Sequence, residues 1–268
     1  KALFDGALSV RILIVLFNTG SLFLIEELTR KKNPYLFYAI CLSVAVAQIG
    51  GFIAVPDVPL LFFVALFFYV YRNFVQNMSF GNTVLLSLSI ALMLYTKYHG
   101  ILIVLFTLLS NPRLLGKYQT YIVAIVSILL FSPHIYWQHL HGYPSVQFHL
   151  FERNATSYRV TFTIEYILGQ LALAGPIVGW LLLYAAFKYK PTDLLERALK
   201  FSVVGFYLFF LISTVKGRVE ANWTLPAFVG LIVLSHQYLN EHIRQQRWVF
   251  RFLPAVLAMI IALRIYMV

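Results

Sequence analysis

Long apolar runs separated by short polar stretches follow one another along most of this 268-residue chain. A helix that crosses the hydrocarbon core of a membrane needs about 17–25 such residues, and it satisfies its own backbone hydrogen bonds there. The pattern therefore predicts an all-α, polytopic transmembrane protein with about ten helices. We expect them near residues 8–29, 35–55, 57–75, 81–97, 99–111, 117–133, 163–187, 199–215, 221–239 and 248–267.

The segment at 99–111 is short for a membrane span. The polar stretch Lys97-Tyr98-His99-Gly100 precedes it and Asn111-Pro112 ends it, so a broken or tilted helix is expected. The sequence contains neither a convincing internal repeat nor a low-complexity linker. We therefore expect residues 1–268 to form a single transmembrane domain.

Composition supports the membrane prediction. The chain is 60% hydrophobic and 12% charged, with a mean hydropathy of +0.79, whereas about a quarter of the residues in a soluble domain are charged. The net charge of +11 would suggest nucleic acid for a soluble protein, but here the positions of the charges matter more than their sum. We expect a lipid bilayer and no nucleic acid as partner. The single cysteine, Cys41, excludes an internal disulfide and a cysteine-based zinc site.

Most of the 21 Lys and Arg residues fall in one set of alternate connections, which the positive-inside rule assigns to the cytoplasm. This set is Arg30, Lys31, Lys32, Arg72, Arg113, Lys117, Lys188, Lys190, Arg197, Lys200, Arg244, Arg247 and Arg251. The remaining cations lie on the other side, close to acids, histidines and aromatics. Residue 1 would then lie outside without an initiator methionine, so we expect an N-terminally truncated chain that lacks at least one helix.

The stretch GFIAVPDVPLLFF places Asp57 between Pro56 and Pro59 at the outer start of a predicted helix. Proline is tolerated in a first helical turn, and the helix dipole there favours an ionised acid. Asp57 is therefore either a helix cap or a functional residue. In the second case, a carboxylate held rigidly at the membrane boundary would act as a base or as a ligand for a polar substrate.

The stretch YTKYHG lies at another outer helix end. Lys97 follows a long apolar run and either extends to the interface among aromatic neighbours or binds a phosphate as a point charge. In the second case Gly100 would let the backbone approach that ligand closely.

The longest outer connection, residues 132–153, holds four of the seven histidines. On a helix His134 and His141 would lie about 10 Å apart, which is too far for one ion, so a divalent metal is only weakly indicated. The aromatic residues are more informative. Tyr136, Trp137 and their neighbours form a surface suited to lying on lipid, as an interfacial amphipathic helix does, or to stacking on sugar rings.

The stretch KGRVEANWTLP brings two cations, an acid, an amide and an indole to an outer helix junction. Its charges either form a solvated ion-pair cap of little energetic value or contribute to a site. If the outer stretches form one site, Asp57, Lys97 and Trp223 must lie close together.

Five ordered stretches, VRILIVLFNTG, PDVPLLFF, LYTKYHG, SPHIYWQHLHGYPSVQFHLFER and GRVEANWTLPAF, resemble the bacterial branch of the protein O-mannosyltransferase family. These are family 39 glycosyltransferases of GT-C architecture, and aminoarabinose transferases for lipid A are relatives. The resemblance runs from about Val10 to Phe228.

The resemblance implies an inverting transferase that moves a sugar from a polyprenyl-phosphate donor to a hydroxyl or phosphate of a lipid, glycan or protein acceptor. The enzyme would be a multi-pass protein of the bacterial inner membrane with its site facing the exterior. Such an enzyme needs no sugar nucleotide, and the resemblance leaves open whether it requires a divalent metal. The resemblance implies that Asp57 is an active-site acid, and that substrate-binding residues are Lys97, His99, Trp137, His141, Asn222 and Trp223. Arg153 and Arg218 are candidates for binding the donor phosphate by their charge and their side of the membrane only.

The family carries an acidic motif in a first extracytoplasmic loop, and this chain is expected to begin after that loop.

The main rival interpretation of the sequence is a transporter or flippase for a lipid-linked or polar solute. A second rival is an outer-face ligase or polymerase on another fold. Transporters place ionisable groups near the bilayer midplane and often show repeated halves. Here the charges collect at one face without a repeat, which favours an enzyme.

Overall fold

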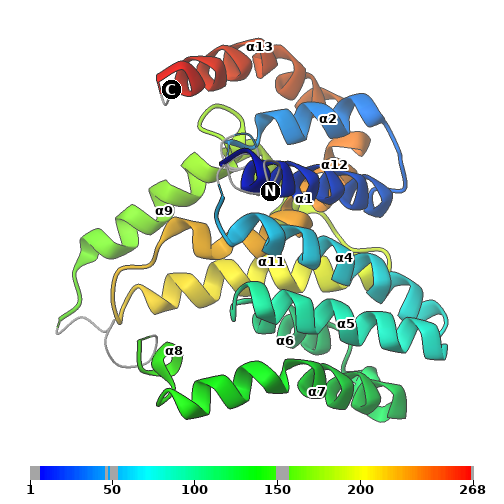
Figure 1. Cartoon of the computed structure of the whole chain (residues 1–268). Coiled ribbons are helices and arrows are strands. Elements are labelled where there is room, and N and C mark those ends of the chain that lie inside the picture. The colour runs from blue at the N-terminus through cyan, green and yellow to red at the C-terminus, as the bar shows by residue number, and fades with distance from the viewer. Residues whose placement is uncertain (1–6, 46–47, 49–53, 149–156, 267–268) are drawn as a thin grey trace.

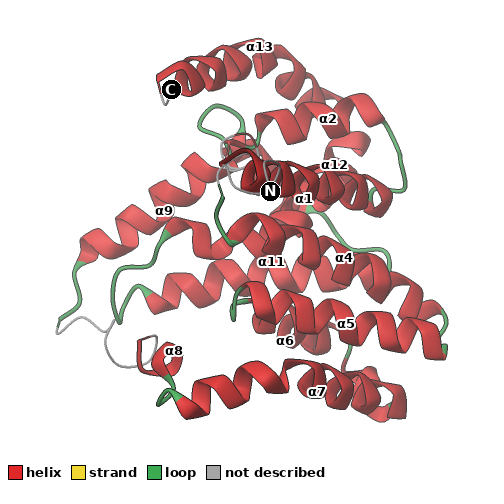
Figure 2. Ribbon diagram, in the orientation of Figure 1, coloured by secondary structure: helices red, strands yellow, loops and turns green. Residues whose placement is uncertain are grey.

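The computed structural model describes the chain except residues 1–6, 46–47, 49–53, 149–156 and 267–268. The described residues form helices joined by short loops, with no strand among them (Figures 1 and 2). The predicted all-α fold is confirmed. The α-helices and the 3₁₀ helices η1 and η3 are α1 (Ala7–Leu28), α2 (Pro34–Ser43), α4 (Asp57–Gln76), α5 (Phe80–Thr96), α6 (Gly100–Ser110), η1 (Pro112–Gly116), α7 (Tyr118–Leu140), α8 (Pro144–Gln147), α9 (Val160–Ala174), α10 (Gly179–Lys188), α11 (Leu194–Ser213), η3 (Ala221–Ala227), α12 (Phe228–Glu241) and α13 (Ile243–Tyr266).

Several helices begin where the sequence supplies a capping side chain. Ser79 accepts a hydrogen bond from the backbone of Asn82 at the start of α5, and Asp193 accepts one from Glu196 at the start of α11. Such caps satisfy backbone N–H groups that have no partner inside the helix. These capping side chains therefore set the residues at which α5 and α11 begin.

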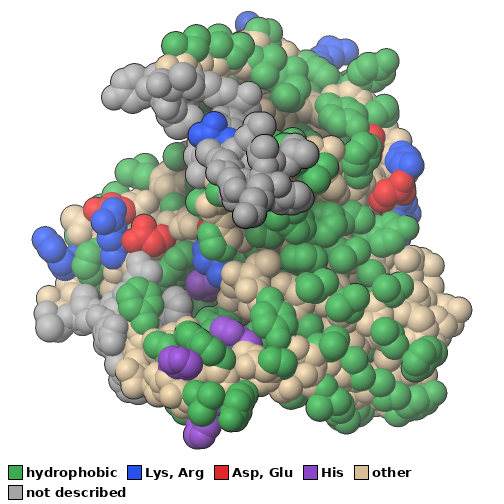
Figure 3. Space-filling view, in the orientation of Figure 1, with side chains coloured by type: hydrophobic (Ala, Val, Ile, Leu, Met, Phe, Trp, Pro, Cys, Tyr) green, Lys and Arg blue, Asp and Glu red, His purple; other side chains and the backbone are tan. Residues whose placement is uncertain are grey.

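The core lies where α4, α11 and α12 meet. Every residue from Phe228 to Leu239 of α12 is buried, as are Phe68 of α4 and Phe206 of α11. By contrast, α7 exposes apolar residues such as Ile128 and Leu129, and apolar side chains cover much of the visible face over α5 and α7 (Figure 3). Helices that are apolar on buried and exposed sides alike suit a lipid environment.

Two helices, α4 and α7, are long and apolar enough to cross a membrane. The pair α9 and α10 passes the same test together, and α2, α5 and α6 are shorter apolar helices. Among the described residues this gives two or three spans by length and composition, fewer than the ten segments expected from the sequence. Most of the difference arises because predicted spans are interrupted or shortened.

The segment 163–187, predicted as one helix, is two. Helices α9 and α10 meet at 96°, and Gly175 between them has φ +122, a conformation that L side chains rarely adopt. In the segment 35–55, the helix α2 ends at Ser43 and Val44 is extended, while residues 46–47 and 49–53 lie outside the described residues. The short helix expected at 99–111 is confirmed as α6, whereas α7 continues beyond its predicted end at residue 133.

The basic connections lie together at one end of the helices. Arg30 forms an ion pair with Asp193, and Arg72 Nη1 donates to the backbone oxygen of Glu27 at 2.9 Å. These contacts join the end of α1 to the end of α4 and to the start of α11. The opposite helix ends, at the starts of α4 and α6, carry the polar residues singled out above.

Replacing Gly175 with alanine is expected to destabilise the protein, because the new Cβ would lie 2.3 Å from the backbone oxygen of Ser43. Strained backbone of this kind costs about 1–3 kcal/mol before the clash is added. A fall in Tm of about 4 °C or more is expected for purified protein in detergent. Gly81→Ala, where the Cβ would meet nothing within 4 Å, is the control. Equal Tm values for the two variants would contradict the analysis.

Candidate functional site

Asp57 is the first residue of α4, and its carboxylate is almost buried. Pro56 is the N-cap residue and makes no side-chain cap hydrogen bond. The Asp57 Oδ1 atom lies 2.7 Å from Lys97 Nζ, and Oδ2 accepts a hydrogen bond from Asn222 Nδ2 at 3.1 Å. The Asp57 carboxylate thus binds side chains from two other segments and does not act as a simple helix cap.

Lys97 ends α5 and is held in the tight turn before α6. Its backbone N–H donates to Met93 O at 3.1 Å, and its own carbonyl accepts from Gly100 N at 3.0 Å. The Lys97 side chain is only 22% exposed, so it turns inward to Asp57 and does not extend to the interface. A Cβ on Gly100 would lie 2.6 Å from Met93 Cγ. Gly100 therefore allows the turn to pack against α5, which is a different reason for a glycine from the ligand approach expected above.

The segment η3 supplies the third side of the cluster. The Thr224 hydroxyl donates a buried hydrogen bond to Gln170 Oε1 of α9, and Gln170 Nε2 donates to Ala221 O at 3.2 Å. These bonds tie η3 to α9. Asn222 faces Asp57, and the Trp223 ring lies 5.1 Å from the ring of His99 and 5.6 Å from that of Phe210.

The structure therefore brings together Asp57, Lys97, His99, Asn222 and Trp223, which we call the Asp57 cluster. They come from the start of α4, the α5–α6 turn and η3, which are far apart in the sequence. A carboxylate, a cation, an amide and aromatic rings can bind a charged, polar ligand that also carries a flat or apolar face.

Trp137 and His141 lie apart from this cluster, at the exposed end of α7. Their rings stack at 4.4 Å, and His134 stacks on the other side of Trp137 at 5.8 Å. Trp137 is 46% exposed. Histidine side chains gather visibly toward the α8 end of this helix (Figure 3). The stack connects to the α5–α6 turn because His134 contacts the hydroxyl of Tyr98.

Arg218, one of the two arginines singled out from the sequence, pairs with another acid and does not belong to the Asp57 cluster. Arg218 Nε lies 3.1 Å from Glu165 Oε2 in a pair whose side chains are 65% and 53% exposed. This geometry matches the solvated ion pair considered above. Arg153 lies outside the described residues.

Among the described residues, no three His, Cys, Asp or Glu side chains gather as ligands for a metal ion. Asp57 is the one carboxylate of the Asp57 cluster, and both of its oxygens are engaged by Lys97 and Asn222. The residues of this cluster therefore do not fit a divalent ion, and we derive no step through one.

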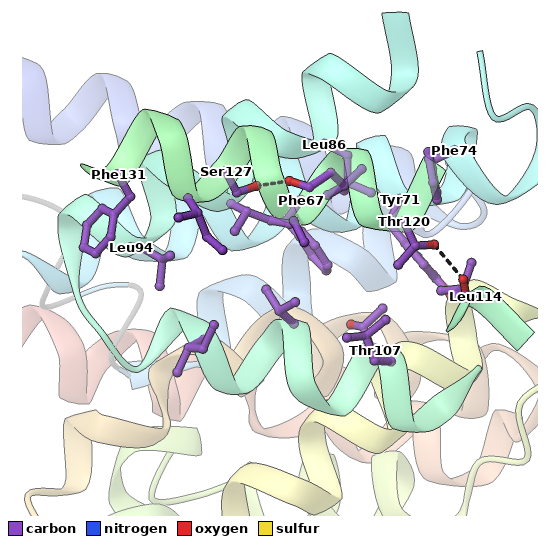
Figure 4. A pocket seen from close by; sticks show the side chains of 17 residues that line it. Phe67, Tyr71, Phe74, Leu86, Leu94, Thr107, Leu114, Thr120, Ser127 and Phe131 are labelled. Carbon is purple, nitrogen blue, oxygen red and sulfur yellow. Dashed lines mark hydrogen bonds between the residues drawn. The ribbon is translucent and has the colours of Figure 1, made fainter. Parts of the chain in front are cut away.

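An apolar cavity of about 210 Å³ begins beside the α5–α6 turn and lies between α4, α5, α6 and α7 (Figure 4). Leu94 and Ile101, which flank the turn, line it, and Phe131 at the same end packs edge-on against Tyr95 at 5.0 Å. Leu114 and Thr120 line its far end. Ile101 and Ile128 both line the cavity and are more than half exposed, so the cavity opens sideways between α6 and α7.

Three residues of the site region were missed from the sequence: Tyr98, Gln138 and Phe210. Gln138 gave no local signal, because its burial and its partners depend on how α7 packs and on the turn into α8. Phe210 gave none, because it stands among many phenylalanines of an apolar span. Tyr98 resembled an ordinary interfacial aromatic residue.

Replacing Lys97 with methionine is expected to destabilise the protein by about 3 kcal/mol, because it leaves the buried Asp57 carboxylate without its cation. The exposed Arg218–Glu165 pair offers a matched control, and Arg218→Met is expected to cost at most about 1 kcal/mol. Thermal unfolding in detergent measures both. Adding Asp57→Asn to Lys97→Met should recover much of the loss. Equal effects of the two single variants would show that the buried pair has no special weight.

Comparisons with known proteins show the family and the fold of this chain. Residues 3–137 match the family described as dolichyl-phosphate-mannose-protein mannosyltransferase. Over 187 residues the chain is 24% identical to the lipid A galacturonosyltransferase RgtD of Rhizobium johnstonii, a match that covers 67% of this chain and 40% of that protein.

Two crystal structures of ArnT from Cupriavidus metallidurans share the fold. The apo structure matches with a TM-score of 0.65 at 13% identity, and the structure bound to undecaprenyl phosphate matches with 0.64 at 14% identity. They cover 88% and 89% of this chain, which spans 47% of each ArnT chain. The chain thus spans less than half the length of these relatives. Because the family match extends over half of its residues, the chain belongs to the dolichyl-phosphate-mannose-protein mannosyltransferase family.

Proposed function

We propose that this protein transfers a sugar from a polyprenyl-phosphate donor to an acceptor hydroxyl at the outer face of a bacterial inner membrane. The observation that carries the proposal is the ion pair between the buried Asp57 and the partly buried Lys97 near one end of an apolar cavity, which Leu94, three residues before Lys97, helps to line. One end of this arrangement suits a phosphate and a sugar, and the other suits a hydrocarbon chain.

Lys97 is the proposed ligand of the donor phosphate. Its ammonium group is a compact point charge on a flexible stem and lies 2.7 Å from Asp57 Oδ1. A bound phosphate would compete with Asp57 for this cation. The positive charge would then lie where negative charge develops as the polyprenyl phosphate departs, which stabilises the transition state.

Asp57 is the proposed ligand of the acceptor. Once the phosphate draws Lys97 away, one carboxylate oxygen becomes able to accept a hydrogen bond from the acceptor hydroxyl, while Asn222 holds the other. Asp57 would thereby orient the hydroxyl or share in removing its proton. His99 and Trp223, whose rings are 5.1 Å apart, would provide a surface for the sugar.

The reaction is a direct displacement. The acceptor oxygen forms a bond to the anomeric carbon as the bond from that carbon to the phosphate oxygen breaks. The bonding electrons leave with the polyprenyl phosphate, and the hydroxyl proton passes to a carboxylate. Attack from the face opposite the leaving group inverts the anomeric centre.

The cavity between α6 and α7 would hold the first part of the donor's hydrocarbon chain. It is lined almost entirely by apolar side chains and opens toward the lipid-facing surface. Apolar cavities of this size stay dry and bind apolar ligands. ArnT has been crystallised with undecaprenyl phosphate, and RgtD is named for lipid A, which supports a lipid donor and, among lipid, glycan and protein, a lipid acceptor.

Replacing Asp57 with asparagine in the full-length protein is expected to lower sugar transfer at least about 100-fold while leaving membrane insertion intact, because the acceptor loses its carboxylate partner. Transfer of radiolabelled sugar from polyprenyl phosphate measures this. Wild-type turnover by the variant would refute the role of Asp57. Solute counterflow in vesicles without any sugar transfer by the wild-type protein would favour a transporter instead.

Narrowing the cavity is expected to discriminate between donors by chain length. Ala124→Phe fills space among the lining residues and should raise the KM for a long polyprenyl-phosphate donor about tenfold, with little effect on a donor of very short chain. Leu109→Phe, at an exposed α6 position that does not line the cavity, is the control. A similar KM change for both chain lengths would exclude the cavity as the site of the hydrocarbon chain.

A further inference from the structure

Gln138 is a buried amide in an exposed part of the molecule. It is 6% exposed, although its neighbours Trp137 and Leu140 in the last turns of α7 are exposed. Its Nε2 atom donates to Tyr98 Oη at 2.7 Å and to Ser145 Oγ at 2.8 Å, and its Oε1 accepts from Ser145 N at 3.4 Å. Both ends of the amide are used to join other segments.

The first of these segments is the α5–α6 turn. Tyr98 lies between Lys97 and His99, and its hydroxyl contacts Gln138, Ser145 and His134. The ring of Tyr98 also lies 5.6 Å from that of His134. A side chain that is fixed at its tip restrains the backbone that carries it, so the Tyr98 contacts limit the positions open to the two cluster residues beside it.

The second segment is the reversal from α7 into α8. Gly142 and Tyr143 both have positive φ, at 70° and 58°, and Tyr143 N donates to Gln138 O at 2.7 Å. The chain turns back so that Ser145 meets the Gln138 side chain. The helix α8 has four residues and none of them is buried, so few other contacts hold it in place.

Glutamine suits this position because its amide carries two donors and an acceptor. A leucine of similar size would leave the Tyr98 and Ser145 hydroxyls without this partner, and an unmade buried hydrogen bond is costly. A glutamate would supply acceptors only, until it is protonated.

We propose that Gln138 is a positioning residue that, through Tyr98, holds the turn carrying Lys97 and His99 and, through Ser145, seats α8 beside that turn. The inference rests on the proposed function, because the purpose of this arrangement is to present Lys97 to the donor phosphate. Gln138 itself touches neither donor nor acceptor.

The first test compares Gln138→Leu with Tyr95→Phe in the full-length protein. Tyr95 is the matched control because its hydroxyl bonds to Leu130 O at 3.0 Å, outside the Gln138 contacts. Binding of undecaprenyl phosphate should weaken about tenfold in Gln138→Leu and stay unchanged in Tyr95→Phe, with kcat for sugar transfer falling in the same variant. Unchanged binding in Gln138→Leu would overturn the positioning role.

A spin label on α8 tests the contacts of Gln138 with Ser145 without a measurement of sugar transfer. Cys41 is the only cysteine and is buried, so a spin label on Val146→Cys, an exposed α8 position, is site-specific. Label mobility should rise when Gln138→Leu or Ser145→Ala is added and stay constant with Tyr95→Phe. Constant mobility in all variants would overturn the seating of α8. If the wild-type protein binds no polyprenyl phosphate, the proposed function and the positioning role fall together, while the label still decides whether Gln138 holds α8.

A conservative variant separates positioning from general loss of stability. Gln138→Glu should bind undecaprenyl phosphate poorly at neutral pH and recover, relative to wild type at each pH, as acid protonates the new carboxyl and restores an O–H donor to Tyr98. Burial raises the pKa of such a carboxyl, so recovery belongs in mildly acidic solution. His134 and Tyr98, the titratable groups facing this position, are the same in both proteins. Absence of recovery would contradict a hydrogen-bonded positioning role.

Discussion

The ion pair between the buried Asp57 and the partly buried Lys97 is the interaction on which the rest of the site depends. It joins the start of α4 to the end of α5, and Asn222 adds η3 to the same carboxylate. Opposite charges that are taken out of water are costly to separate, so the pair restrains three segments at once. In the proposed function the same pair takes part in the chemistry, because the donor phosphate replaces Asp57 as the partner of Lys97.

The membrane sets the second constraint. Apolar side chains on both buried and exposed faces, as on α7, are favourable only where lipid replaces water, and polar groups are then expected at helix ends. The Asp57 cluster lies at such ends, near a cavity that exposed apolar residues of α6 and α7 help to line. A molecule with a charged head and a long hydrocarbon chain matches both halves of this arrangement.

The sequence predicted the helical fold and most helix positions, because apolar runs between polar turns are a strong signal. It also predicted that Asp57, Lys97 and Trp223 lie close together, which the structure confirms. It missed the 96° break between α9 and α10, although the pair Gly175-Pro176 marks a turn, because apolar residues continue on both sides of that pair. It also missed Gln138, whose partners Tyr98 and Ser145 are set by how α7 packs and by the turn into α8, and no local pattern reports this.

The most direct measurement is equilibrium binding of undecaprenyl phosphate to purified wild-type, Lys97→Gln and Arg218→Gln proteins. Lys97 is partly buried near one end of the cavity, whereas Arg218 pairs with Glu165 in an exposed position, so only the first substitution removes the proposed phosphate ligand. The account predicts at least about tenfold weaker binding for Lys97→Gln, a loss of about 1.4 kcal/mol in binding free energy, and wild-type binding for Arg218→Gln. Wild-type affinity in the Lys97 variant would contradict it.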